Sequence, residues 1–120
     1  MSNSRQAAER RGRRAETLAA WLLRAKGYRI LAQRFRVAAG EIDLIARRGR
    51  TIAFVEVKAR ADRTAALEAV SPQQRRRIAA AAEGWLARHG DAADSTLRFD
   101  VVAVLPGRLP THLADCWRPE

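Results

Sequence analysis

Two short runs of strand-forming residues, joined by a basic turn, constrain the fold of this chain more than any other part of its sequence. The first run covers 41–46 and the second 51–59, with an arginine- and glycine-containing segment between them. Apolar, β-branched runs separated by such a segment are typical of an antiparallel hairpin. Both runs also carry acids, Glu41 and Asp43 in the first and Glu56 in the second. A functional site would explain these carboxylates.

Alternation along a strand decides which of these side chains can meet. Glu41 and Asp43 share one face of their run, and Glu56 and Lys58 share one face of theirs. If the hairpin closes around 48–49, Glu41 lies opposite Glu56 and Asp43 becomes a diagonal neighbour of Glu56. The acids and Lys58 then form one cluster. An odd-length loop or a bulge would shift this pairing.

A carboxylate cluster of this kind suits a divalent cation. Crowded carboxylates raise each other's pKa unless a positive charge lies between them, and Mg²⁺ typically takes one or two carboxylates together with water and phosphate oxygens. Lys58, one of only two lysines among 23 basic residues, could hold a water for attack on a phosphodiester. The alternative is a solvated face with ion pairs such as Glu41 with Lys58. In a basic domain, an aspartate followed by a Glu-x-Lys motif, here Asp43 with Glu56 and Lys58, favours the metal interpretation.

The charge of the chain favours a polyanionic partner. The 120 residues carry a formal net charge of +10, and residues 1–40 hold 10 basic and 2 acidic side chains. Basic charge gathered in this way is typical of nucleic-acid binders, although arginine-rich coding bias with a solvated basic face would produce the same count. The candidate phosphate contacts are Arg10, Arg13, Arg14, Arg75 and Arg76.

Length and composition predict one soluble globular domain. The chain is 48% hydrophobic, yet it has no apolar run near the roughly 18 residues of a membrane span and no signal-peptide pattern. Its single cysteine, Cys116, excludes an internal disulfide and a cysteine-based zinc site. We therefore expect a cytoplasmic protein.

Two helices are predicted around the hairpin. Apolar residues recur at helical spacing over 5–26, with Gly27 as the stop. A second helix begins at Ser71, which starts an S-x-x-Q capping box ending at Gln74. Glu16 lies at the rim of the first apolar stripe, where a surface acid offsetting nearby arginines is the simpler interpretation.

The remaining segments predict strands and loops. Residues 28–36 favour a strand, 60–70 a loop or short irregular helix, and 97–105 a buried strand. A last short segment covers 109–113, and Trp117 is expected to pack as a terminal anchor.

Four blocks in this order resemble the YraN-like family of small bacterial proteins. They are Gly12-x-x-Ala15-Glu16, Gly27-Tyr28-x-Ile30, the hairpin motif Gly40-Glu41-Ile42-Asp43-Leu44-Ile45 with Phe54-Val55-Glu56-Val57-Lys58, and Arg98-Phe99-Asp100. That family is similar to archaeal Holliday-junction resolvases and, more widely, to the PD-(D/E)xK restriction-endonuclease-like nucleases. The resemblance implies an α/β fold, a single domain over 1–120 with a central mixed sheet flanked by helices.

The resemblance also implies a Mg²⁺- or Mn²⁺-dependent DNA nuclease, with branched or structured DNA as one substrate class. Asp43 and Glu56 would hold the metal, Lys58 would serve the nucleophilic water, and Glu16 would join them from the first helix. Glu41 becomes a supporting acid. This chain departs from the family pattern at Gln33, where asparagine is frequent, and at 73–75, where a lysine is frequent.

Two other functions fit parts of the sequence. A non-catalytic nucleic-acid-binding protein with a degenerate nuclease fold would bind DNA in a salt-sensitive way without cleaving it. An arginine-rich RNA-binding or ribosome-associated domain leaves the acids unexplained, and its three tryptophans are spaced for packing. Since resolvase-like enzymes are often dimers, a homodimer is one expected arrangement.

Overall fold

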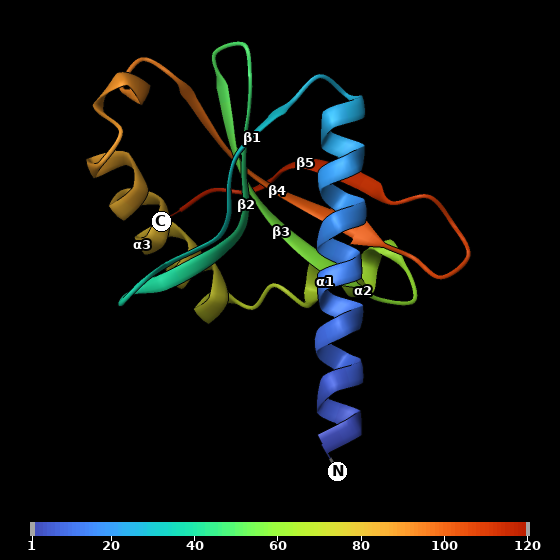
Figure 1. Cartoon of the computed structure of the whole chain (residues 1–120). Helices are drawn as coiled ribbons and strands as arrows, with labels where there is room; N and C mark the ends of the chain where they lie inside the picture. Colours follow the sequence, from blue (N-terminus) through green and yellow to red (C-terminus); the bar gives the residue numbers. More distant parts are fainter. Residues whose placement is uncertain (1, 120) are drawn as a thin grey trace.

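The predicted hairpin forms the middle of a five-stranded mixed sheet in the computed structural model, which describes residues 2–119 (Figure 1). Residues 1 and 120 of the predicted domain lie outside the described residues. The strand order is β1-β2-β3-β4-β5; β3 and β4 are parallel and the other neighbours antiparallel. The strands are β1 (Arg29–Val37), β2 (Gly40–Arg48), β3 (Thr51–Ala59), β4 (Thr96–Val104) and β5 (Thr111–Trp117). The helices are α1 (Ser2–Ala25), α2 (Arg63–Glu68) and α3 (Pro72–Ala87), with a 3₁₀ turn, η1, at Gly90–Ala92.

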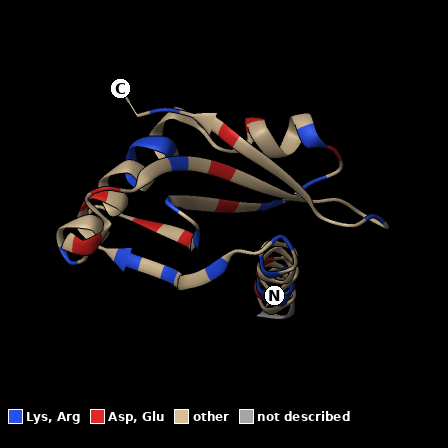
Figure 2. Cartoon of the chain, turned by 90° about the horizontal axis from the view of Figure 1, so that it is seen from above, with Lys and Arg blue, Asp and Glu red and all other residues tan. Residues whose placement is uncertain are grey.

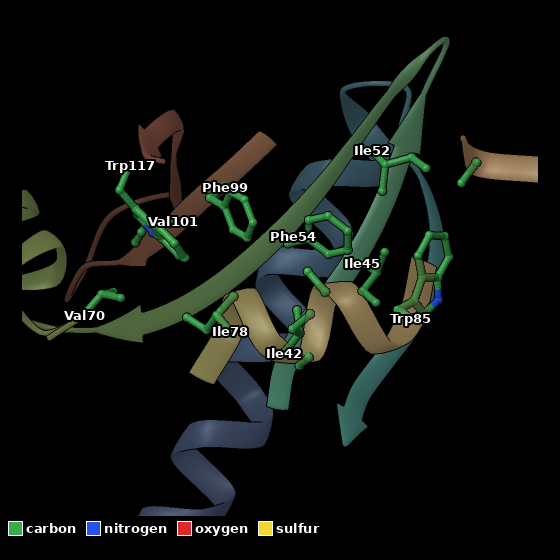
Figure 3. Packing of buried hydrophobic residues seen from close by; sticks show 13 residues of the cluster. Ile42, Ile45, Ile52, Phe54, Val70, Ile78, Trp85, Phe99, Val101 and Trp117 are labelled. Atoms are coloured by element: carbon green, nitrogen blue, oxygen red, sulfur yellow. The ribbon is translucent and has the colours of Figure 1, made fainter. Parts of the chain in front are cut away.

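The two long helices cover opposite faces of the sheet. Ile78 and Trp85 of α3 pack on a cluster that includes Phe54 and Ile45 (Figure 3). Leu23 of α1 packs on the other face, against a cluster that includes Leu44 and Val55 of the same strands. Figure 2 looks along α1 and shows it lying on one side of the strands. The fold class inferred from the family resemblance, an α/β domain with a flanked mixed sheet, is confirmed.

The hairpin closes one residue later than predicted. Arg48 lies opposite Thr51, so the turn consists of Gly49 and Arg50. Gly49 has a positive φ of 60°, and two-residue hairpin turns favour glycine in this conformation. The predicted turn around 48–49 is therefore wrong, because the glycine takes the first turn position.

This later turn changes which residues lie opposite each other in the hairpin. Leu44 lies opposite Val55, so the predicted pairing of Glu41 with Glu56 is wrong. A shift of two residues returns every side chain to the same face of the sheet, whereas a shift of one would reverse it. The side chains of β2 do not alternate strictly here, because Ile42 and Ile45 both join the cluster under α3. Asp43 and Glu56 are still neighbours, but at the split between the strands and not through a shared face.

Helix and strand ends mostly follow the local signals. Gly27, with a φ of 91°, ends α1, and the neighbouring Tyr28 N–H donates to the Leu23 carbonyl at 2.9 Å. The segment predicted as a loop or short helix forms α2. Trp117 ends the last strand, which is longer than predicted, and its ring lies 4.3 Å from that of Phe99. The predicted terminal anchor is confirmed. None of the described helices is both long and apolar enough to cross a membrane.

Candidate functional site

The acidic residues of the hairpin lie where β2 and β3 separate. Pairing between these strands ends at Leu44 and Val55, although both strands continue beyond that pair. Asp43 and Glu56 are the first residues past it, and Figure 1 shows the two strands diverging there. The split leaves room at the sheet for groups from elsewhere in the chain to approach the two carboxyls.

Each of these two carboxyls is held through one oxygen. The Val57 backbone N–H donates to Oδ2 of Asp43 at 2.8 Å, and the Gln74 side-chain amide donates to Oε2 of Glu56 at 3.1 Å. The Glu56 residue is only 4% exposed, while Asp43 is half-buried. Asp43 and Glu56 also lie within hydrogen-bonding reach of each other.

The two carboxyls cannot both be charged without a positive partner. Burial raises the pKa of Glu56 well above its ordinary value, to about 10, and the adjacent Asp43 raises it further through a hydrogen bond and its charge. The Lys58 ammonium lowers this pKa, but by less. The pair therefore holds a proton more tightly than free carboxyls do, and a cation between the carboxyls would replace that proton.

Replacing Glu56 with glutamine is expected to stabilise the metal-free protein at neutral and alkaline pH. Between the ordinary Glu pKa of 4.5 and the raised folded value, the folded protein binds more protons than the unfolded chain, so stability falls as pH rises. Glutamine stays neutral and avoids this loss, which approaches about 1.4 kcal/mol per pH unit for one group. Thermal unfolding of wild type and Glu56→Gln at pH 5 and pH 8 measures the difference in stability. The increase in melting temperature should be larger at pH 8.

The matched control for this measurement is Glu41→Gln. Glu41 is an exposed acid on the same strand as Asp43 and pairs with Arg36 at 3.4 Å. It should show little difference between the two pH values. A Glu56→Gln protein with the same melting temperature as wild type at both pH values would contradict a buried, protonated Glu56.

Gln74 belongs to the site, although the sequence assigned it to a helix cap. Ser71 does cap α3, accepting a hydrogen bond from the Gln74 backbone N–H at 3.1 Å. The Gln74 side chain instead turns to Glu56, so the reciprocal half of the predicted capping box does not form. A glutamine at the start of α3 reaches the carboxyls because α3 lies on the same face of the sheet as Phe54.

Glu16 shares a cavity with Asp43 but pairs with an arginine that the sequence did not single out. Arg34 of β1 donates through Nε and Nη2 to both Glu16 oxygens, at 3.0 to 3.1 Å. The cavity, of about 330 Å³, is lined by Glu16, Arg34, Asp43 and Arg13 among others. The pairing with Glu16 raises the pKa of Arg34, and the Asp43 charge adds to this. Arg34 depends on β1 lying beside both α1 and β2, so no local sequence pattern identifies it.

Lys58 lies next to Glu56 but borders a different hollow. It lines a groove of about 950 Å³ with the middle of α1 and the β4–β5 loop, and Gly12 lines both this groove and the Asp43 cavity. The structure thus brings together Asp43, Glu56 and Lys58 at the strand split, with Glu16 close by across the Asp43 cavity.

The predicted phosphate contacts do not form one surface. Arg13 and Arg14 lie on α1 and line the Asp43 cavity and the Lys58 groove, respectively. Arg75 and Arg76 of α3 line a third hollow, of about 370 Å³, beside Trp117. Arg10 is exposed on α1. Figure 2 shows basic residues on several elements and acids within the strands, so a polyanion could approach from more than one side.

In the block Arg98-Phe99-Asp100, the two charged residues serve the fold on the opposite face, whereas Phe99 packs with Phe54 under α3. Asp100 lies in register with Val55, whose side chain packs towards α1. Burial alone would raise the pKa of Asp100, but hydrogen bonds from His112 and Arg98 lower it to about 2. His112 Nε2 bonds Asp100 at 2.7 Å, and Arg98 also reaches the Tyr28 hydroxyl. This network ties β4 to β5 and to the end of α1.

The donor set at the strand split fits a hard divalent cation. Asp43 and Glu56 offer carboxylate oxygens, and Mg²⁺ commonly takes one or two such ligands and completes its shell with water and substrate oxygens. Among the described residues, no group of three or more His, Cys, Asp or Glu side chains is arranged to hold a metal ion. A cation here would therefore depend on the Asp43–Glu56 pair.

Comparison with known proteins places this geometry in a family. Residues 15–104 match the family model described as "Uncharacterised protein family UPF0102". The chain is 58% identical over 113 residues to a UPF0102 protein of Parvibaculum lavamentivorans, covering 94% of this chain and 85% of that protein. It is 56% identical over 116 residues to a UPF0102 protein of Agrobacterium fabrum, covering 97% and 95%. The resemblance inferred from the four blocks is confirmed: the chain belongs to the UPF0102 family, which is YraN-like and restriction-endonuclease-like.

Proposed function

We propose that this protein is a cytoplasmic, Mg²⁺-dependent nuclease that hydrolyses phosphodiester bonds in DNA, including branched or structured DNA. The observation that carries the proposal is the pair of adjacent carboxyls, Asp43 and Glu56, at the split between β2 and β3. Burying the Glu56 carboxyl beside a second acid costs stability, and such a pair is typical of functional sites. Binding a cation that also contacts a DNA phosphate fits this pair of acids, because a chain of net charge +10 attracts a polyanion.

Each residue at the split has a role in this proposal. Asp43 and Glu56 would hold Mg²⁺ or Mn²⁺, with Val57 N–H and Gln74 fixing their orientation. The ion would supply Lewis-acid activation of the phosphodiester and of the attacking water. Lys58, beside Glu56 on the same face of β3, would hold that water in place and oppose the negative charge that develops on the phosphate. The exposed arginines of α1 and α3 would contact phosphates of the bound DNA.

One observation favours a second function, DNA binding without cleavage. The carboxylate of Glu16 is taken up by Arg34, and the described residues offer no third acidic ligand at the split. A site with this composition would be inactive if two carboxylates cannot hold the ion in place. The basic residues would then support binding alone.

Cleavage assays on a substrate panel separate the two functions. Duplex, branched and single-stranded DNA are incubated with the purified chain in Mg²⁺, in Mn²⁺ or in EDTA, and binding is measured over a range of salt concentrations. Metal-dependent cleavage of any substrate supports the nuclease. Salt-sensitive binding with no cleavage in either metal would reject it in favour of the binding protein.

A further inference from the structure

Arg34 has a backbone conformation that an arginine rarely adopts. Its φ is 53°, in the left-handed region that glycine and asparagine accept far more readily than long side chains. It lies within β1, between Gln33, which pairs with Leu44, and Phe35, which pairs with Ile42. Backbone strain of this kind gathers at functional sites, where the surrounding structure holds it.

The strained backbone directs the Arg34 side chain into the cavity that also contains Asp43. There the guanidinium meets Glu16 of α1 in a two-pronged contact. The side chains are 43% and 18% exposed, and ion pairs open to water contribute little to stability. Stabilisation by the pair is therefore a poor explanation for an arginine at a strained position.

The geometry of the pair leaves half of the guanidinium for another ligand. Glu16 takes Nε and Nη2, and Nη1 takes no part in this pairing. A guanidinium has five N–H donors in a rigid plane, so one edge can bind a carboxylate while the other binds two phosphate oxygens. Glu16 holds the plane fixed, which lowers the entropy lost when a phosphate binds.

We propose that Arg34 binds the scissile phosphate group of the DNA beside Asp43, and that Glu16 is a positioning residue that holds Arg34 instead of a ligand of the metal. This inference rests on the proposed nuclease function and changes the role that the family resemblance gave to Glu16. Arg34 would act as a catalytic residue by opposing the charge that builds on the phosphate oxygens.

A double-mutant cycle on Glu16 and Arg34 tests this assignment. The variants are Glu16→Gln, Arg34→Gln and the double variant, with Arg36→Gln as the control. Arg36 lines the same cavity and carries the same charge, but its contact with Glu41 is single and longer, at 3.4 Å. We expect Arg34→Gln to lower kcat about 100-fold with a smaller change in KM, Glu16→Gln to lower it about 10-fold, and Arg36→Gln to leave kcat near wild type.

The double variant and the metal affinity decide the role of Glu16. If Glu16 acts through Arg34, the double variant should cleave no more slowly than Arg34→Gln alone. Mn²⁺ affinity, measured by electron paramagnetic resonance without DNA, should then be the same in Glu16→Gln as in wild type. The inference would be overturned if the double variant lost the product of the two single losses in kcat, or if Glu16→Gln bound Mn²⁺ about tenfold more weakly, a loss typical of a residue that supports a metal site. Either result would make Glu16 a metal ligand.

Folding and the proposed function are controlled separately. Melting temperatures check each variant, and Arg34→Gly, which suits the left-handed backbone, replaces Arg34→Gln if the latter does not fold. If wild type cleaves nothing, the nuclease proposal fails, and DNA binding in EDTA decides the phosphate contact. The plot of log affinity against log salt concentration should be less steep by about one in Arg34→Gln. An unchanged slope would reject Arg34 as a phosphate ligand.

Discussion

Replacing Asp43 with asparagine is expected to reduce Mg²⁺-dependent DNA cleavage at least about 1000-fold, because a ligand charge worth several kcal/mol is removed from the metal position. Asparagine has nearly the same shape as aspartate and keeps an oxygen that can accept the 2.8 Å hydrogen bond from Val57 N–H. The local structure should therefore survive the change. DNA affinity should stay within about threefold of wild type, since it depends on arginine contacts with phosphates.

Single-turnover cleavage, with binding measured in parallel, checks this prediction. Glu41→Gln provides the control, because it removes one acid from the same strand at an exposed position that pairs with Arg36. It should cleave at close to the wild-type rate. Cleavage by the Asp43→Asn protein at the wild-type rate would remove Asp43 from the metal position. Equal loss of cleavage and binding would instead indicate that Asp43 supports the fold.

Replacing Gly40 with alanine is expected to destabilise the fold by at least about 3 kcal/mol, the upper range for overpacking a well-packed interior. A Cβ at this position would lie 2.0 Å from the Arg77 carbonyl oxygen and 2.6 Å from the Arg77 carbonyl carbon. Both atoms belong to the α3 backbone, which cannot move aside as the end of a flexible side chain could. The start of β2 would have to leave α3, which would also displace Asp43.

Thermal or denaturant unfolding measures this effect, and Gly12→Ala is the matched control. Gly12 lies within α1, and a Cβ there meets no atom within 4 Å. The same substitution should stabilise the protein by about 0.5 to 1 kcal/mol, because alanine favours the helix. The two changes therefore have opposite expected signs. A Gly40→Ala protein as stable as wild type would mean that α3 does not approach β2 this closely.

Local patterns in the sequence predicted most of the elements and grouped the hairpin acids with Lys58, and the family resemblance selected Asp43 and Glu56 among those acids. β3 has the predicted bounds, α3 begins after its Ser71 cap, and Gly27 ends α1. Each of these depends on residues only a few positions apart. The hairpin turn was misplaced by one residue, and alternation fails in β2, where Ile42 and Ile45 pack on the same side. The two acids nevertheless meet because the pairing of β2 with β3 ends at Leu44 and Val55, immediately before them.

The sequence by itself determined which strands form, and that two acids and a lysine lie close together in the central hairpin. Only the tertiary structure decided what approaches that group. Arg34 reaches Glu16 because β1 packs beside α1, and Gln74 reaches Glu56 because α3 lies across the sheet. These contacts join residues 18 positions apart, with a turn or loop between their elements. No periodicity within one helix or strand encodes them, because they depend on how the elements pack.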